Sequence, residues 1–517
     1  EEEEGEEGPT RTDMAIACML LGSVAFVMAL FSLVNYPDED MRFYAWNVVS
    51  STIAIFLAVL MFNAVNTFIH LKVVGVDANA FVVGIVDFLQ IVILFILLQV
   101  ANAILSGVMA DTPYKSKQTR WNPLKQEEEE FTVELQVEER DLKMRCWGTL
   151  FAHMTGFFSI NLGSVLQRSP MCNTSPVMTF MVVPIMYMGQ MLLFRIFRTI
   201  RVRIVSQYNA KIRQELGYSK DEFVPIETWE KKMMQEPERF GKAYAMRRWD
   251  MELYEAENDI AGLCLSFLLV QACCFAITGV LPDPEKPDME LHSLGCMAKL
   301  LSIAVVVVLG IFTCSNIMAD YFEGEQKPGT SRAFLKRCLC VFESMLSFSF
   351  AWCLLYTAKW SIAYVTVLGG VQSLQTRVVL AILISFGCFC VILGLDMISD
   401  MGLSGGQAGS LSIFSMIESL GTLVGFSWEN SFEGGVEVIA KLTADPVIAE
   451  LGLAVIVTVI VIVPWRRFIL TQVLKKEKEW DERHRQKEEA EAVERAKSPA
   501  GANQKGMYRQ MPQVPTA

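Results

Sequence analysis

Long apolar runs, separated by short polar segments, recur from one end of the chain to the other. Most of them have the roughly 20 residues that an α-helix needs to cross the hydrocarbon core of a bilayer. The pattern predicts an all-α fold, namely a polytopic transmembrane helix bundle with about eleven spans. The predicted spans are residues 14–34, 43–67, 80–105, 146–166, 176–197, 259–281, 293–315, 338–358, 377–399, 410–432 and 447–470.

Segment 410–432 departs most from this pattern, because it contains Glu418, Gly421, Gly425 and Glu429 among its apolar residues. It could form a re-entrant hairpin instead of a span. The distribution of Lys and Arg favours a span, since positively charged loops gather on the cytoplasmic side of a membrane. The basic loops follow the third, fifth, seventh and last predicted spans. They share one side only if 410–432 crosses the membrane.

The positions of the basic loops also predict that the N-terminus lies outside and the C-terminus lies in the cytoplasm. Asn173, in the sequence Asn173-Thr174-Ser175, then falls in an outer loop and is a possible glycosylation site. The first apolar run is too long for the core of a signal peptide and lacks a basic segment before it, so we interpret it as a span. Nothing in the sequence identifies which membrane holds the protein.

The polar segments divide the chain into five parts. These are an acidic N-terminal tail (1–13), the first five spans (14–197), a cytoplasmic helical segment (198–258), the last six spans (259–470) and a cytoplasmic charged helix with a disordered tail (471–517). Charged residues surround the helix predicted over 474–497, which is typical of a solvated or coiled-coil helix. The segments 198–258 and 474–497 are possible binding surfaces for a protein partner.

The composition is also that of a membrane protein. Charged residues make up only 20% of the chain and its mean hydropathy is +0.34, values outside the range of ordinary soluble domains. The net charge of −12 argues against nucleic acid as a partner. The 13 cysteines lack zinc-site spacing. We expect a lipid bilayer as the surroundings, no cofactor and no resident metal.

Five acidic residues interrupt the apolar runs: Asp87, Glu343, Asp396, Glu418 and Glu429. An ionisable group at the centre of a span costs roughly 2.5–3.5 kcal/mol on insertion scales. No Lys or Arg lies deep in a predicted span to neutralise these acids. Carboxylates are ligands that hard cations prefer, so the five acids predict a pathway for a cation or a proton. Alternatively, each acid reaches interfacial water near a helix end, or is protonated and hydrogen-bonded.

A glycine-rich connection, with Gly402, Gly405, Gly406 and Gly409, precedes segment 410–432. It could act as a hinge or form a tight turn. The same stretch contains Ser404 in a Gly-x-Ser-x-Gly pattern that is similar to the serine motif of rhomboid-type intramembrane proteases. That chemistry needs a His on a later span, but the only later His is in the charged tail. We therefore expect the protein not to be an enzyme.

Arginines follow one another at short intervals at the end of the fifth predicted span: Arg195, Arg198, Arg201 and Arg203. The spacing resembles the arginine-rich helix of voltage sensors. Because these residues begin near the end of the helix, we interpret them as anchors that extend to the interface.

Two functions from different classes remain open. The first is a transporter or channel that moves a cation or proton, or is coupled to one, through the intramembrane acids. The second is a non-transporting scaffold or receptor-like protein that signals through its cytoplasmic helical segment and tail. The arrangement of Asp87, Glu343 and Glu418 discriminates between them. A pathway predicts that these acids face one common cavity, whereas a scaffold predicts that they point to lipid headgroups or lie in separate sites.

Overall fold

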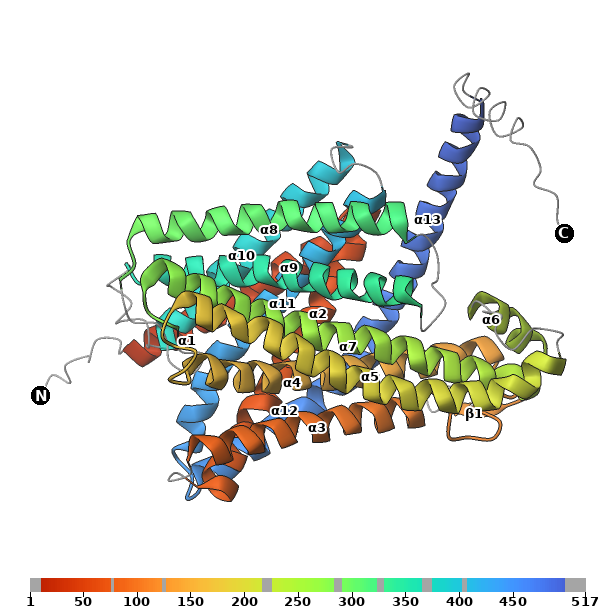
Figure 1. Cartoon of the computed structure of the whole chain (residues 1–517), viewed down its shortest axis with the longest axis horizontal. Coiled ribbons are helices and arrows are strands. Elements are labelled where there is room, and N and C mark those ends of the chain that lie inside the picture. Colours follow the sequence, from red (N-terminus) through yellow and green to blue (C-terminus); the bar gives the residue numbers. More distant parts are fainter. Residues whose placement is uncertain are drawn as a thin grey trace, which may run out of the picture.

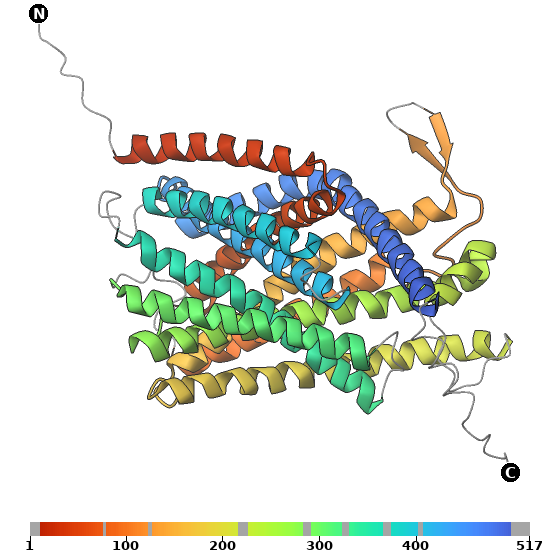
Figure 2. The same ribbon diagram turned by 90° about the horizontal axis from the view of Figure 1, so that it is seen from above.

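A computed structural model describes residues 11–75, 79–122, 127–215, 226–282, 291–322, 330–364, 374–401 and 407–497. Nearly all of these residues are helical. The helices that form the bundle are α1 (Arg11–Val34), α2 (Glu39–Phe68), α3 (Ala80–Leu105), α4 (Val133–Arg168), α5 (Pro176–Glu215), α7 (Pro237–Thr278), α8 (Leu294–Tyr321), α9 (Ser331–Ile362), α10 (Leu374–Asp400), α11 (Gln407–Ala440) and α12 (Pro446–Pro464). Their long axes run side by side in one elongated bundle (Figure 1; Figure 2).

Ten helices in the described part of the chain are long and apolar enough to cross a membrane. The predicted polytopic all-α bundle is thus confirmed, and the chain is a multi-pass membrane protein. The count differs from the predicted eleven at the first span, 14–34. This segment lies in α1, whose described apolar part, Met19–Val34, is shorter than the other spans.

Short polar residues set the starts of several helices. The Asp38 carboxylate accepts hydrogen bonds from the backbone N–H groups of residues 40 and 41 at 2.8 and 2.9 Å, and so caps α2. Thr132, Ser293 and Thr330 cap α4, α8 and α9 in the same way. Such caps satisfy N–H groups that have no partner within the helix. At the other end of α7, Gly279 adopts a left-handed conformation with φ 78° and ends the helix.

Segment 410–432 lies within α11, a single helix of 34 residues, so the structure contains no re-entrant hairpin at this segment. The helix packs closely on α2. A Cβ placed at Gly421 would lie 3.1 Å from Val48 Cα, and one placed at Gly425 would lie 2.5 Å from the Thr52 carbonyl oxygen. The two glycines form a small-xxx-small pair, which lets two membrane helices approach backbone to backbone.

One end of the bundle extends beyond the apolar runs. There α5 and α7 continue past the predicted spans towards the short helix α6 (Ile226–Gln235), and we call this end of the molecule the α6 end (Figure 1). The opposite end carries the π-helical segment η1 (Ile69–Val74), and we call it the η1 end. Much of the predicted cytoplasmic segment 198–258 is therefore continuous with membrane helices. A small apolar cluster that includes Tyr114, Trp229 and Phe240 attaches α6 to α7.

The α3–α4 connection contains the strands of the described chain, β1 (Thr119–Asn122) and β2 (Glu127–Glu130). They pair antiparallel, with Arg120 opposite Glu129. The sequence did not predict this hairpin, because the acidic run of β2 has low strand propensity.

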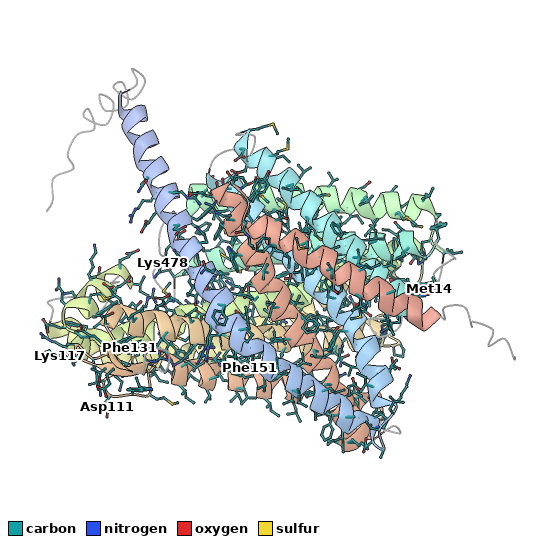
Figure 3. All side chains as sticks on the ribbon, turned by 180° about the vertical axis from the view of Figure 1, so that it is seen from behind. Met14, Asp111, Lys117, Phe131, Phe151 and Lys478 are labelled. Atoms are coloured by element: carbon teal, nitrogen blue, oxygen red, sulfur yellow. The ribbon has the colours of Figure 1, made fainter. Side chains whose placement is uncertain are left out.

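The last helices form one continuous rod with a change of pitch. The π-helical segment η3 (Trp465–Ile469) joins α12 to α13 (Leu470–Lys497). The predicted helix over 474–497 is confirmed, but its first half is not fully solvated. Trp480 is buried and its ring lies 5.3 Å from that of Phe43 and 6.3 Å from that of Phe414. Figure 3 shows this half of α13, with Lys478 labelled, lying against the bundle.

Candidate functional site

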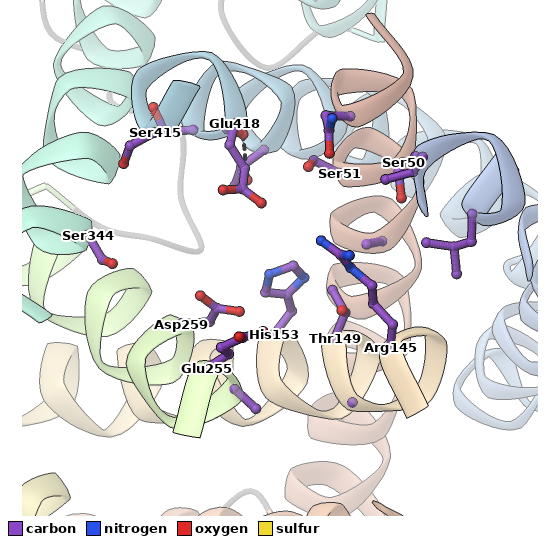
Figure 4. Close-up of a pocket in the computed structure, with 18 of the residues that line it drawn as sticks. Ser50, Ser51, Arg145, Thr149, His153, Glu255, Asp259, Ser344, Ser415 and Glu418 are labelled. Atoms are coloured by element: carbon purple, nitrogen blue, oxygen red, sulfur yellow. Dashed lines mark hydrogen bonds between the residues drawn. The ribbon is translucent and has the colours of Figure 1, made fainter. Parts of the chain in front are cut away.

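A cavity of about 330 Å³ lies inside the bundle towards the α6 end. Its walls come from α2, α4, α7, α9 and α11, and the η3–α13 segment covers one side. The described lining residues include five carboxylates but only one guanidinium, that of Arg145. The acids are Glu252, Glu255, Asp259, Glu418 and Glu477. Figure 4 shows that several of these side chains point into the space between the helices.

Helix α7 contributes three of the acids from one face. Glu252, Glu255 and Asp259 stand at positions i, i+3 and i+7, which fall on the same side of an α-helix. At 1.5 Å per residue they extend over about 10 Å of the helix axis. This face of α7 is therefore an acidic strip along the cavity wall.

Helix α4 contributes Arg145, Thr149 and His153, spaced four residues apart on one face. The Arg145 guanidinium donates a hydrogen bond to the Glu477 carboxylate of α13. His153 points into the cavity (Figure 4), and only 7% of its surface is exposed. Its Nδ1 has no hydrogen-bond partner within the described chain. The cavity thus contains one polar ring with unused hydrogen-bonding capacity.

Helix α11 supplies Glu418 opposite the acidic strip of α7, and the Glu418 carboxylate points towards the centre of the cavity in Figure 4. Glu418 and Glu255 are exposed although both line a cavity between helices, so water reaches both. Hydroxyl groups fill much of the remaining wall. They belong to Ser50, Ser51, Thr149, Ser344, Ser347, Ser415, Ser419 and Thr422. The Ser347 and Ser415 hydroxyls bind each other at 2.7 Å.

An aromatic layer closes the cavity towards the η1 end. The layer consists of Phe157 of α4, Trp352 of α9 and Phe426 of α11. Each ring lies four residues, or about one helical turn, after a residue that lines the cavity. The Phe426 ring centroid lies 6.2 Å from that of Phe157 and 5.2 Å from that of Trp352. Rings at these distances are in contact. The hydrated space therefore ends at a layer of packed apolar side chains.

Only Glu418 of the five predicted acids lines this cavity. Asp87 is fully buried in α3, and its Oδ1 lies 3.0 Å from Nε2 of His70 in η1. The partner of Asp87 is thus a histidine, so the absence of Lys and Arg from the spans does not leave this acid alone. Glu343 of α9 faces α8 instead, where the Ser315 hydroxyl donates a hydrogen bond to it.

The other two predicted acids also lie apart from the cavity. Asp396 is buried near the end of α10, and its Oδ1 has no hydrogen-bond partner among the described residues. Glu429 of α11 is 99% buried beyond the aromatic layer. The Asn63 side-chain amide donates to both Glu429 and Glu433 at 3.1 Å.

The five acids therefore occupy separate places, with Glu418 and Glu429 on opposite sides of the aromatic layer. Asp87, Glu343 and Glu418 do not face the common cavity that a pathway through them predicts, and this outcome by itself favours the scaffold. A pathway would have to combine Glu418 with acids outside the predicted set.

A buried ionic network holds three helices together beside the cavity. Glu257 of α7 accepts hydrogen bonds from Arg201 of α5 at 2.7 Å and from Arg337 of α9 at 2.6 Å. Arg201 also donates to Asp250 at 3.2 Å. Glu257 and its two arginine partners, Arg201 and Arg337, are each at least 96% buried. The interpretation of the fifth-span arginines as interfacial anchors is thus wrong for Arg201, which pairs with acids inside the bundle.

The glycine-rich connection is mostly outside the described residues. Gly402, Gly405, Gly406 and the protease-like Ser404 all lie there, whereas Gly409 is in the first turn of α11. The hinge thus stays a prediction. Asn173 lies exposed in the turn between α4 and α5, and its glycosylation stays a prediction.

Sequence reasoning missed four of the five acids that line the cavity. Glu252, Glu255 and Asp259 stand in or beside the charged stretch that reads as cytoplasmic, and Glu477 stands in the charged tail. The i, i+3, i+7 spacing was the signal that could have found the strip on α7.

The described part of the chain contains no group of three or more His, Cys, Asp or Glu residues close enough to hold a metal ion. No protein-family model, curated protein or solved structure matches the sequence or the fold. The function therefore has to be argued from the cavity itself.

Proposed function

We propose that this chain is a membrane transporter that binds a cation or a proton in the acidic cavity and moves it across the bilayer. The observation that carries the proposal is Glu418, which faces the acidic strip of α7 across a water-accessible space inside a bundle of membrane helices. A cytoplasmic position for the α6 end is part of the proposal and follows from the basic loops.

The charge of the cavity supports a cationic ligand. Each ionised acid at membrane depth costs a few kcal/mol unless water, a proton or a counter-ion compensates it. Arg145 supplies one positive charge and binds Glu477, which leaves the three acids of α7 and Glu418 without an arginine or lysine in the described lining. An entering cation would relieve repulsion among these four carboxylates.

The aromatic layer supports a transporter more than an open channel. A channel needs a continuous polar route, whereas here packed rings separate Glu418 from Glu429. Both acids stand on α11, eleven residues apart, which corresponds to about 16 Å along the helix. Transport would require Phe426 and its neighbours to separate while the cavity closes at the α6 end. That is the pattern of alternating access.

The test is uptake by liposomes that contain the purified full-length protein. Protons, Na⁺, K⁺ and Ca²⁺ would be followed with fluorescent indicators, and putrescine and agmatine with radiolabel. We expect uptake of at least one cation above that of empty liposomes, and Glu418→Gln to lower it at least about tenfold by removing the charge.

Glu343→Gln is the matched control, because it removes an acid from a membrane helix outside the cavity. It should transport like the original protein. Equal losses in the two variants would contradict a special role for the cavity. No uptake of any tested cation would overturn transport and favour the scaffold alternative.

A further inference from the structure

We infer that the ligand of the cavity is a small organic cation, namely a compact molecule with one or more ammonium or guanidinium groups. The inference rests on the proposed function insofar as the ligand is cargo, but binding can be measured without transport. Four features of the cavity point to this class: the spread of its acids, its size, its mixed walls and the Nδ1 of His153, which has no partner among the described residues.

The acids are too far apart for one metal ion. Metal ions hold oxygen ligands at about 2–2.6 Å, so a site needs several donors around one point. The α7 strip extends over about 10 Å, and Glu418 stands across the cavity from it. No cluster of three potential metal ligands occurs in the described chain. A ligand that satisfies both walls must itself be several ångströms long.

The volume agrees with such a ligand. A space of 330 Å³ equals that of about ten liquid water molecules, at about 30 Å³ each. It falls at the lower end of the range of small-molecule pockets, about 300–1,000 Å³. A bare ion would leave most of this space to water.

The walls also match an organic cation. Phe348, Phe414 and Trp465 line the cavity beside the carboxylates. Aromatic faces attract ammonium and guanidinium groups, and they pack against the methylene groups between them. The eight lining hydroxyls can accept the N–H bonds that the carboxylates do not reach.

His153 is the independent observation that indicates a ligand. A buried polar group without a partner costs free energy, and such groups are uncommon in folded proteins. A neutral imidazole has one nitrogen that accepts a hydrogen bond and one that donates. An ammonium group between His153 and Asp259 could donate to both, because both residues line the same cavity and their side chains point into it (Figure 4).

The experiment is equilibrium binding of radiolabelled putrescine and agmatine to the purified full-length protein in detergent. Saturable binding is expected for at least one of them, and 1,4-butanediol, which has the length of putrescine without its charge, should not compete. Glu418→Gln and Asp259→Asn should each weaken binding at least about tenfold, since each removes a charge-assisted hydrogen bond. Glu343→Gln should bind like the original protein. Equal melting temperatures would show that the cavity variants are folded.

Three results would overturn the inference. They are the absence of saturable amine binding, equal binding by Glu418→Gln and the original protein, and full competition by butanediol. Uptake of inorganic cations without amine binding would refute the organic ligand and leave transport standing. Amine binding without uptake of any cation would support the ligand class and refute transport.

Discussion

The contact between α2 and α11 gives a quantitative test of the fold around the cavity. In Gly425→Ala the new Cβ would lie 2.5 Å from the carbonyl oxygen of Thr52, whereas ordinary contacts begin at 3.4 Å. The obstacle is backbone and cannot rotate away. The two helices would have to separate by roughly 0.9 Å at this point.

Gly435→Ala is the matched control on the same helix, because a Cβ there meets nothing within 4 Å. Both substitutions gain the same helix propensity, about 0.5–1 kcal/mol. This gain cancels in a comparison of the two variants. The difference that remains is the overpacking at Gly425, about 1–3 kcal/mol for one inserted methyl group.

The assay is reversible unfolding of the full-length protein in mixed detergent micelles, with the free energy of unfolding measured for each variant. We expect Gly435→Ala to be at least as stable as the original protein and Gly425→Ala to be less stable than Gly435→Ala by the overpacking energy. Similar stabilities for both variants would refute the close packing of α2 on α11. Because both helices line the cavity, Gly425→Ala should also alter cation uptake.

Two further predictions concern the network and the tail. Glu257→Ala leaves the buried Arg337 without its carboxylate and Arg201 with Asp250 as its remaining acid, and should lower stability by about 3–5 kcal/mol. Glu437→Ala, at an exposed pair, should cost about 0–1 kcal/mol. Thermal unfolding compares the two variants, and equal effects would contradict the burial of the network. Trp480→Ala removes the ring that attaches α13 to the bundle, so backbone amides of residues 470–485 should exchange with deuterium faster in hydrogen-exchange mass spectrometry. The exposed Trp121 of β1 provides the control, because Trp121→Ala should leave that exchange unchanged, and unchanged exchange in Trp480→Ala would argue against docking.

Hydropathy alone predicted the helices well, because a span must be apolar over a length that the bilayer fixes. Each of the eleven predicted spans lies mostly in a helix, and 80–105 coincides with α3. The ends were less predictable. Helix α7 begins at Pro237, more than twenty residues before the predicted span, because its polar first half is covered by other helices and not by lipid.

Packing between helices also explains why most of the acids of the cavity were not predicted from the sequence. Glu418 was identifiable because an acid in an apolar run is costly and rare. Its partners Glu255 and Asp259 stand where charge is ordinary, at the edge of a polar stretch. Only the placement of α7 and α11 around one cavity brings these acids together, and this placement depends on tertiary packing that local sequence does not encode.

The continuous rod formed by α12, η3 and α13 has a mechanical consequence. Trp465, at the start of η3, donates a hydrogen bond to Ser50 at 3.0 Å, so this point is fixed to α2. Beyond Glu477, α13 continues for twenty residues, about 30 Å of stiff helix. If the far end of α13 moved sideways, the helix would pivot about Trp465. The motion would displace Val473 and Glu477, which form part of the cavity wall. A partner that binds the far end of α13 would therefore change the access of ligands to the acids of the cavity.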